Sequence, residues 1–163
     1  MALEKIEELA EEILREFRVS TLPIPVEDIA SKKSIKISRA PSKDFSGLLI
    51  RKDGHALIGV NSNDAPVRQR FTIAHELGHF FLHPQKDAFV DYRDNKSDIM
   101  RTPREKQANM FAAALLMPRK QLEKDYKKVS RDGFGEGELK GLAEKYCVSE
   151  DAMKYRLLNL NFD

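Results

Sequence analysis

The sequence predicts a single α+β domain with a small antiparallel sheet. The chain has 163 residues, of which 41% are hydrophobic and 33% charged, and these values suit one domain with a core of its own. Segments with the alternating polarity of strands are grouped between residues 34 and 61, whereas helix-like segments lie on both sides of them. Strands grouped in this way favour an α+β architecture over repeated β-α-β units.

The bulk properties exclude several classes of protein. No apolar run approaches the ~20 residues that a membrane-spanning helix needs, so we expect no membrane partner. The acidic, amphipathic N-terminus is typical of neither a signal peptide nor a transit peptide. The single cysteine, Cys147, allows no internal disulfide and favours a reducing, cytoplasmic setting. A net charge of +2 does not by itself indicate a nucleic-acid partner.

The first part of the chain is predicted to form two helices and three strands. Apolar residues from Leu3 to Phe17 follow helical spacing, and a short helix begins near Val26 after two prolines. Residues 34–38 alternate apolar and polar side chains as a strand does. Two apolar runs then flank the dipeptide Asp53-Gly54, which is a strong signal for a β-hairpin.

Two longer helices are predicted next. The first begins at Asn63 or Asp64, either of which can cap its N-terminus, and ends by Pro84. The second spans residues 102–118, with a threonine cap and a proline in its first turn. Between these helices, residues 85–102 form a polar stretch that is predicted to be a loop.

Residues 119–163 are predicted to be helical and to end in a segment like a helix-turn-helix. Ser149 caps the last helix, and Glu150 and Asp151 open it with negative charge, which would repel DNA phosphates. The segment holds ten Lys/Arg and nine Asp/Glu, a net charge of +1. We therefore expect it to pack on the rest of the domain rather than bind DNA; docking of a protein substrate remains open. Its expected apolar face comprises Leu139, Leu142, Ala143, Ala152, Met153, Leu157 and Leu158.

The first long helix carries the pattern H-E-x-x-H, from His75 to His79. Residues four apart lie one turn apart on the same helical face, so these two imidazoles can converge on one zinc ion. Glu76 lies about 100° further round the helix, where a carboxylate can take a proton from a zinc-bound water. The five-residue pattern also occurs by chance, but its position within an apolar helix after a hairpin favours a metal site.

A catalytic zinc ion needs a third protein ligand and an open position. His83 is a candidate by residue type, but on a continuous helix it lies about 80° away from His75, and we expect it to meet the carbonyl groups at the helix end instead. Glu105 on the next helix is the better candidate, because small residues on its face and Gly78 on the first helix allow the helices to approach closely. Glu105 can alternatively complete a capping box with Thr102. The carboxylates between the helices remain further candidates: Asp87, Asp91, Asp94 and Asp98.

Two segments together resemble the ImmA/IrrE family of metallo-endopeptidases. They are RFTIAHELGHFFLHP at residues 70–84 and EKQANMFAAALLMP at residues 105–118, and the resemblance extends from about Gly59 to Pro118. It implies one metallopeptidase domain over residues 1–163, with a zincin-like core at 1–118 followed by a helical subdomain at 119–163. Two linked motifs in the same order are far more specific than H-E-x-x-H alone.

The resemblance also implies the roles of individual residues. The site is gluzincin-like, with Zn²⁺ held by His75, His79 and Glu105, and with Glu76 as the general base. Asn109, one turn after Glu105, is then a candidate for supporting a ligand. Tyr92 or an arginine of the 85–102 loop is a candidate for stabilising the oxyanion.

Members of this family are associated with mobile elements, prophages and radiation responses, and with the cleavage of helix-turn-helix transcriptional repressors. The resemblance therefore implies a zinc endopeptidase whose protein substrate is a DNA-binding repressor, with no direct nucleic-acid partner. The alternative is a non-catalytic, zinc-containing module that binds DNA or a repressor. The strand at His55–Asn61 is expected either to lie at the sheet edge and pair with an extended substrate, or only to cover the zinc helix.

Overall fold

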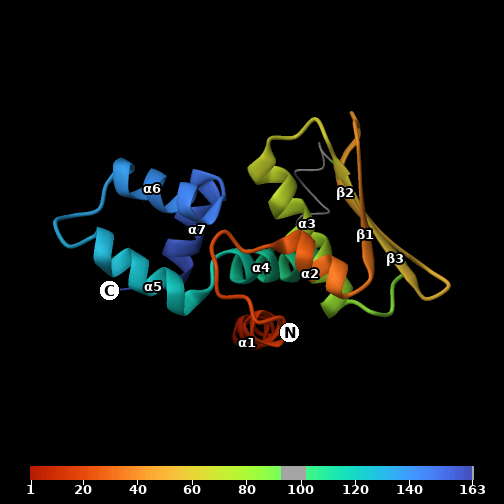
Figure 1. Cartoon of the computed structure of the whole chain (residues 1–163), viewed down its shortest axis with the longest axis horizontal. Coiled ribbons are helices and arrows are strands. Elements are labelled where there is room, and N and C mark those ends of the chain that lie inside the picture. Colours follow the sequence, from red (N-terminus) through yellow and green to blue (C-terminus); the bar gives the residue numbers. More distant parts are fainter. Residues whose placement is uncertain (93–101, 163) are drawn as a thin grey trace.

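The computed structural model describes residues 1–92 and 102–162 and confirms the α+β class (Figure 1). Within these residues, seven helices accompany one four-stranded sheet. None of the described helices has the length and apolar character needed to cross a bilayer. In chain order, the elements are α1 (Leu3–Glu16), α2 (Val26–Lys32), β1 (Ile35–Ala40), β2 (Phe45–Lys52), β3 (His55–Asn61), α3 (Pro66–Leu82), β4 (Ala88–Tyr92), α4 (Pro103–Leu116), α5 (Arg119–Val129), α6 (Glu136–Tyr146) and α7 (Glu150–Leu160).

The elements form two groups along the long axis of the molecule (Figure 1). The sheet stands at one end and α5, α6 and α7 at the other, with α3 and α4 between them. Helix α1 packs on α4 through a stripe of apolar residues at helical spacing, and Ile6, Ala10 and Ile13 are buried there. Leu3, in the first turn, was expected to pack on this core, but it is 41% exposed.

The sheet is mixed rather than wholly antiparallel. Its strand order is β1-β3-β2-β4, and β2 and β3 form the predicted hairpin, with positive φ at Asp53 and Gly54. Strand β1 pairs with the other side of β3 and runs parallel to it. The expectation that β3 forms a sheet edge is wrong, because β1 and β2 both pair with it.

Strand β4 comes from the region that was predicted to be a loop. Its five residues, AFVDY, pair antiparallel with β2, and this pairing supplies partners for their backbone N–H and C=O groups. The polar residues on either side of this short segment hide it in the sequence. Within the described chain, β4 is the edge strand next to β2. The side chain of Phe89 points from it into the core and is 4% exposed.

Helices α3 and α4 pack closely, as their small residues predict. A Cβ atom added at Gly78 would lie 3.0 Å from both the Cα and the carbonyl oxygen of Ala108. Thr102 caps α4 as expected, since its Oγ1 accepts from the backbone N–H of Glu105 at 3.2 Å. Neither Asn63 nor Asp64 is the N-cap of α3; the cap is Ala65, because the residue before Pro66 must be extended.

The C-terminal helices pack on the rest of the chain through α7. Arg156 is 4% exposed, forms an ion pair with Glu7 of α1, and donates to the carbonyl oxygen of Met117 at 3.1 and 3.0 Å. Ser149 caps α7, accepting from the N–H of Ala152 at 3.0 Å.

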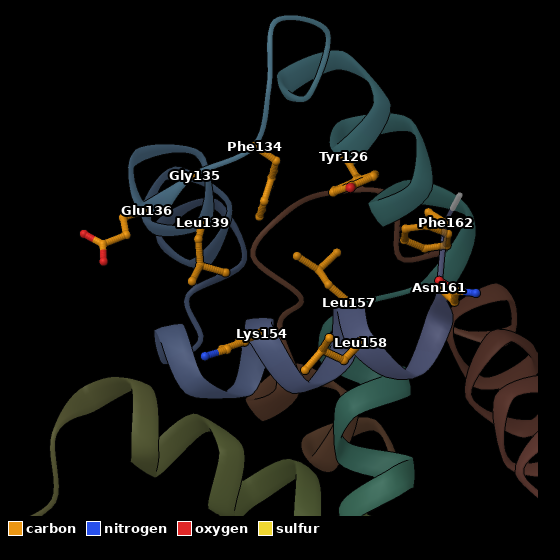
Figure 2. A pocket seen from close by; sticks show the side chains of 10 residues that line it. All are labelled: Tyr126, Phe134, Gly135, Glu136, Leu139, Lys154, Leu157, Leu158, Asn161 and Phe162. Atoms are coloured by element: carbon orange, nitrogen blue, oxygen red, sulfur yellow. The ribbon is translucent and has the colours of Figure 1, made fainter.

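A pocket of about 480 Å³ lies between the ends of α5, α6 and α7 (Figure 2). Leu158 was expected to pack inside, but it is 67% exposed and lies at the rim of this pocket. The side chains in Figure 2 come from the three helices and from residues next to their ends, and those of Phe134 and Leu157 point toward each other across the hollow. The residues that line the pocket with apolar surface are Tyr126, Phe134, Leu139, Leu157, Leu158 and Phe162.

Candidate metal centre

The most buried stretch of α3 carries the H-E-x-x-H residues. His75 is 2% exposed, and Glu76 and His79 are both 0% exposed. Glu105, in the first turn of α4, is 6% exposed and faces them. Charged and polar side chains are rarely buried to this extent without partners, so the cluster is unusual for a protein core.

The carboxylate of Glu105 lies between the two imidazoles. Its Oε2 is 2.9 Å from Nε2 of His75, and its Oε1 is 3.0 Å from Nε2 of His79. Only half of the alternative capping box forms: the Glu105 backbone N–H bonds to Thr102, but its side chain turns away from the cap. The first turn of α4 therefore directs one carboxylate at both histidines of α3.

These three residues fit a metal ion. Their ligand atoms all lie within 4.8 Å of one another, and two atoms bound at ~2.1 Å to a tetrahedral ion would be ~3.4 Å apart. Although they are close, Nε2 of both histidines and Oε2 of Glu105 are buried without a well-directed hydrogen bond. Buried polar atoms that aim at a common point rather than at each other are what a metal site requires. Two imidazoles and one carboxylate are a usual ligand set for Zn²⁺.

The electrostatics of the cluster favour charge on Glu105. Burial opposes this charge, but contacts with His75 and His79 outweigh it and lower the pKa of Glu105 to about 2. Burial also opposes charge on His75, yet Glu105 and Glu76 raise the pKa of this imidazole to about 9. The pKa of His79 is lowered, with burial as the main cause. The Glu105 carboxylate is therefore negatively charged at neutral pH, as a cation-binding group should be.

Glu76 follows His75 on α3 and is fully buried next to the candidate ligands. Both of its oxygens are buried without a hydrogen-bond partner, and burial raises its pKa to about 8. Strand β2 passes close to α3 at Gly47, where an added Cβ would lie only 2.2 Å from Cγ2 of Thr72 but at an ordinary contact distance, 3.6 Å, from Oε1 of Glu76. A carboxyl group held here can take up and release a proton close to the ligand atoms.

Side chains behind the ligands fix the imidazole rings. Oδ1 of Asn109 lies 2.8 Å from Nδ1 of His75. The ring of Phe89 stacks on His79, with centroids 3.9 Å apart and planes inclined by 13°. Nδ1 of His79 lies 2.9 Å from Nδ1 of His83. Ligand histidines usually have such a partner on the nitrogen that faces away from the metal.

The expectation that the His83 side chain meets the carbonyl groups at the helix end is wrong, whereas His83 lies outside the candidate metal-binding group as expected. Helix α3 ends at Leu82, and His83, with φ −126° and ψ 62°, leaves the helical path and turns its ring back to His79. The helix end is capped instead by Arg51 of β2, which donates to the carbonyl oxygens of His79, Phe80, His83 and Lys86 at 3.3, 2.6, 3.1 and 2.7 Å. Spacing did contain a signal for the contact, because residues 79 and 83 are also four apart.

Among the described carboxylates between the two helices, Asp87 and Asp91 are not part of the candidate metal-binding group. The one such group in the described residues is His75, His79 and Glu105. Asp91 lies near enough for its charge to act on His75 and Glu76. Asp94 and Asp98 lie outside the described residues, as do the arginines of the 85–102 loop. Tyr92 ends β4 and is 47% exposed.

The fold and the site together define a class. An H-E-x-x-H helix packed on a small sheet, with a glutamate from the following helix beside both histidines, has the layout of gluzincin-like metallopeptidases. The comparison with family models agrees: residues 30–158 match the IrrE N-terminal-like domain, a peptidase family, and the chain belongs to this family.

Individual relatives cover parts of the chain. It is 35% identical to the radiation response metalloprotease IrrE of Deinococcus radiodurans over 104 residues, and this aligned stretch covers 63% of this chain and 31% of that protein. It is 43% identical over 65 residues to the protein of the same name from Deinococcus deserti, 39% of this chain and 23% of that protein. It is 32% identical over 97 residues to the metallopeptidase ImmA of Bacillus subtilis, 60% of this chain and 56% of that protein. The matched stretch is thus between about a quarter and just over half of each relative's length.

A solved structure shares the fold. A transcriptional regulator of Mycobacterium tuberculosis superposes with a TM-score of 0.68 over 94% of this chain and 46% of that chain, at 17% identity. At this identity, the likeness concerns the architecture alone.

Proposed function

We propose that the chain is a zinc-dependent endopeptidase. The observation that carries this proposal is the contact of Glu105 with Nε2 of both His75 and His79, next to the buried and unpartnered carboxylate of Glu76. In this proposal, His75, His79 and Glu105 bind Zn²⁺, and Glu76 is the catalytic base. Membership of a peptidase family and the metallopeptidase names of the relatives support the same class of reaction.

The residues divide the work of peptide hydrolysis. Bound Zn²⁺ supplies a Lewis acid and lowers the pKa of a bound water toward ~7. Glu76 takes the proton from the attacking water and later delivers it to the leaving amine nitrogen. Asn109 holds the His75 ring in place, and Phe89 holds the plane of the His79 ring. Burial of Glu76 excludes bulk water from this proton transfer.

We further propose that an extended substrate segment pairs with β4. The sequence suggests β3 for this role, but β3 is an internal strand. Within the described residues, β4 is an edge strand, and it carries Phe89, which touches the His79 ring. Backbone hydrogen bonds along an edge strand hold a peptide in extended form, with alternate side chains on opposite faces. A carbonyl group of such a peptide would lie close to the metal ligands.

The substrate class that we propose is a helix-turn-helix transcriptional repressor, cleaved in the cytoplasm. The support for it is the resemblance of the two linked motifs to the ImmA/IrrE family. The competing function is a non-catalytic zinc module that binds DNA or a repressor. The even charge of residues 119–163 and the acidic start of α7 make DNA binding the weaker of the two.

The test is the variant Glu76→Gln, co-expressed with a helix-turn-helix repressor; genes next to the one for this chain are the first place to look for that repressor. The variant should keep one zinc ion per chain and lose cleavage by a factor of about 10² to 10⁴, because it cannot accept the proton. Glu8→Gln, an exposed position on α1, is the matched control and should cleave like the wild type. Zinc content is measured by elemental analysis, and cleavage by gel and mass spectrometry. Cleavage by Glu76→Gln at the wild-type rate would rule out the mechanism, and zinc binding without cleavage by the wild type would favour the non-catalytic module.

A further inference from the structure

A row of three side chains leads away from the proposed metal position. Nε2 of His79 faces Glu105, and Nδ1 of His79 lies 2.9 Å from Nδ1 of His83. On the other side of the His83 ring, Nε2 lies 2.8 Å from Oε1 of Gln107. His79 and His83 are 0% and 6% exposed, so the contact between their rings is shielded from solvent. The hydrogen bonds in this row must therefore be satisfied within the protein.

The direction of each hydrogen bond follows from the metal. If Nε2 of His79 gives its lone pair to zinc, the ring proton of neutral His79 resides on Nδ1. That N–H can donate only if Nδ1 of His83 carries no proton. Neutral His83 then has its proton on Nε2, where it needs an acceptor, and Oε1 of Gln107 is in place for it. The opposite orientation of the Gln107 amide would set two donors against each other along the row.

The hydrogen bonds of this row also fix the orientation of the His79 ring about its Cβ–Cγ bond. Stacking on Phe89 fixes the plane of the ring but accepts either of the two orientations related by a 180° turn about the Cβ–Cγ bond. The turned ring would present a carbon atom instead of Nε2 to the metal. A bond from Nδ1 to His83 exists only in the orientation that directs Nε2 toward Glu105.

Two local features bring these side chains together. His83 is the C-cap of α3, so its backbone leaves the helix and its ring can return to a residue one turn back. Gln107 lies two residues after Glu105, so a single turn of α4 provides both a proposed ligand and the end of the row. The guanidinium group of Arg51 donates to the carbonyl groups at this helix end. The His83 ring is therefore not needed there and can bond to His79 instead.

We infer that His83 and Gln107 are positioning residues, which fix the tautomer and the orientation of His79 for metal binding through Nε2. This inference rests on the proposed function, because it takes His79 as a zinc ligand. Removing such a partner usually weakens metal binding by about 10- to 100-fold. Neither residue touches the proposed metal position, so the loss comes from the disorder of His79 rather than from the loss of a ligand.

The experiment measures the affinity for Zn²⁺ by competition with a chromophoric chelator. His83→Leu should bind Zn²⁺ about 10- to 100-fold more weakly, because a leucine accepts no hydrogen bond. His83→Asn should recover most of the affinity, since its Oδ1 can occupy the place of Nδ1 as an acceptor. Gln107→Leu should lose about 10-fold, because it removes the acceptor for the second bond of the row. The matched control is His55→Leu, an exposed histidine at the start of β3, which should bind like the wild type.

A spectroscopic measurement separates positioning from a general effect on folding. Long-range ¹⁵N correlation spectra of the zinc-loaded protein should show a protonated Nδ1 on His79, and on His83 an unprotonated Nδ1 with a protonated Nε2. A proton on Nδ1 of His83, or wild-type affinity in both His83→Leu and Gln107→Leu, would overturn the inference while leaving the zinc site intact. A wild-type chain that binds no Zn²⁺ would overturn the proposed function and this inference with it.

Discussion

Replacing Gly78 with alanine tests the close approach of α3 and α4. The added Cβ would lie 3.0 Å from the Cα and from the carbonyl oxygen of Ala108, and 3.3 Å from Cβ of Phe111. Two of these three contacts are with backbone, which cannot turn aside as the end of a flexible side chain does. The variant therefore has to separate the helices by a few tenths of an ångström.

The expected loss follows from two opposing effects. Alanine is favoured over glycine within a helix by about 1 kcal/mol. Overpacking a tight contact costs about 1–3 kcal/mol, so the net loss of stability is about 1 kcal/mol. For a chain of this size, that lowers Tm by about 2–4 °C. Zinc binding requires Glu105 of α4 to lie close to the histidines of α3. In the variant, binding must therefore work against the separation of the helices, and a cost of about 1 kcal/mol weakens the zinc affinity about fivefold.

The assay is thermal unfolding of the metal-free protein together with chelator competition for Zn²⁺. Gly141→Ala is the control, because Gly141 lies within α6 and an added Cβ meets no atom within 4 Å. It should stabilise the chain by about 0.5–1 kcal/mol and leave the zinc affinity unchanged. If Gly78→Ala is stabilised as much as this control and binds zinc as the wild type does, the close packing of the helices does not hold the ligands together.

Three further outcomes can be measured by urea or thermal unfolding. Arg51→Met removes the donors at the end of α3 and should lower the free energy of unfolding by about 2–3 kcal/mol, whereas an unchanged value would show that water satisfies these carbonyls equally well. Removing zinc with a chelator should cost about 2.7 kcal/mol if free zinc had been at 100 times Kd. Tyr146→Phe removes a hydrogen bond of 2.6 Å to Asp125 and should cost about 1–2 kcal/mol at neutral pH. Burial opposes charge on Asp125, but Tyr146 and its other donors outweigh burial and lower the pKa of this carboxyl. Its contribution is therefore present above the unfolded value of ~3.9 and is lost as the pH falls below it, so the difference between Tyr146→Phe and wild type should shrink there.

The pair His75 and His79 could be predicted from the sequence because a spacing of four residues on a helix places both side chains on the same face. Four residues on a helix fix a distance and a shared face, whatever the rest of the chain does. Glu105 could be predicted only as one of several candidates. Its backbone serves the cap of α4, as the capping box predicts, and its side-chain direction depends on how near α3 lies. That distance is a tertiary property, set by the contact of Gly78 with Ala108.

The contact of His83 with His79 could not be predicted by the same reasoning, because the predicted helix included His83, whereas α3 ends at Leu82. A position about 80° away from His75 is correct for a straight helix, but His83 is a C-cap with non-helical dihedral angles. The residue that ends the helix in its place, Arg51, lies 32 positions earlier in the chain. A hydrogen bond over that separation leaves no local pattern in the sequence.

The arrangement of the strands escaped prediction for a similar reason. The hairpin of β2 and β3 was predictable, since Asp53-Gly54 specifies its turn. Pairing of β1 with β3, and of β4 with β2, joins segments far apart in the sequence. Strand β4, AFVDY, is only five residues long and lies within the largely polar stretch of residues 85–102, so its apolar and aromatic residues did not stand out as a strand.

The spacing of three residues on α4 accounts for the contact of α4 with a histidine beyond the end of α3. Glu105 and Asn109 are four apart and share a face, and both contact the side of the site formed by His75. Gln107 is rotated by about 200° from Glu105 and cannot reach the same point. It contacts His83 instead, which lies past the last helical residue of α3. Turning α4 about its axis to improve one set of contacts would break the other, so the two sets together hold the Glu105 carboxylate in one orientation.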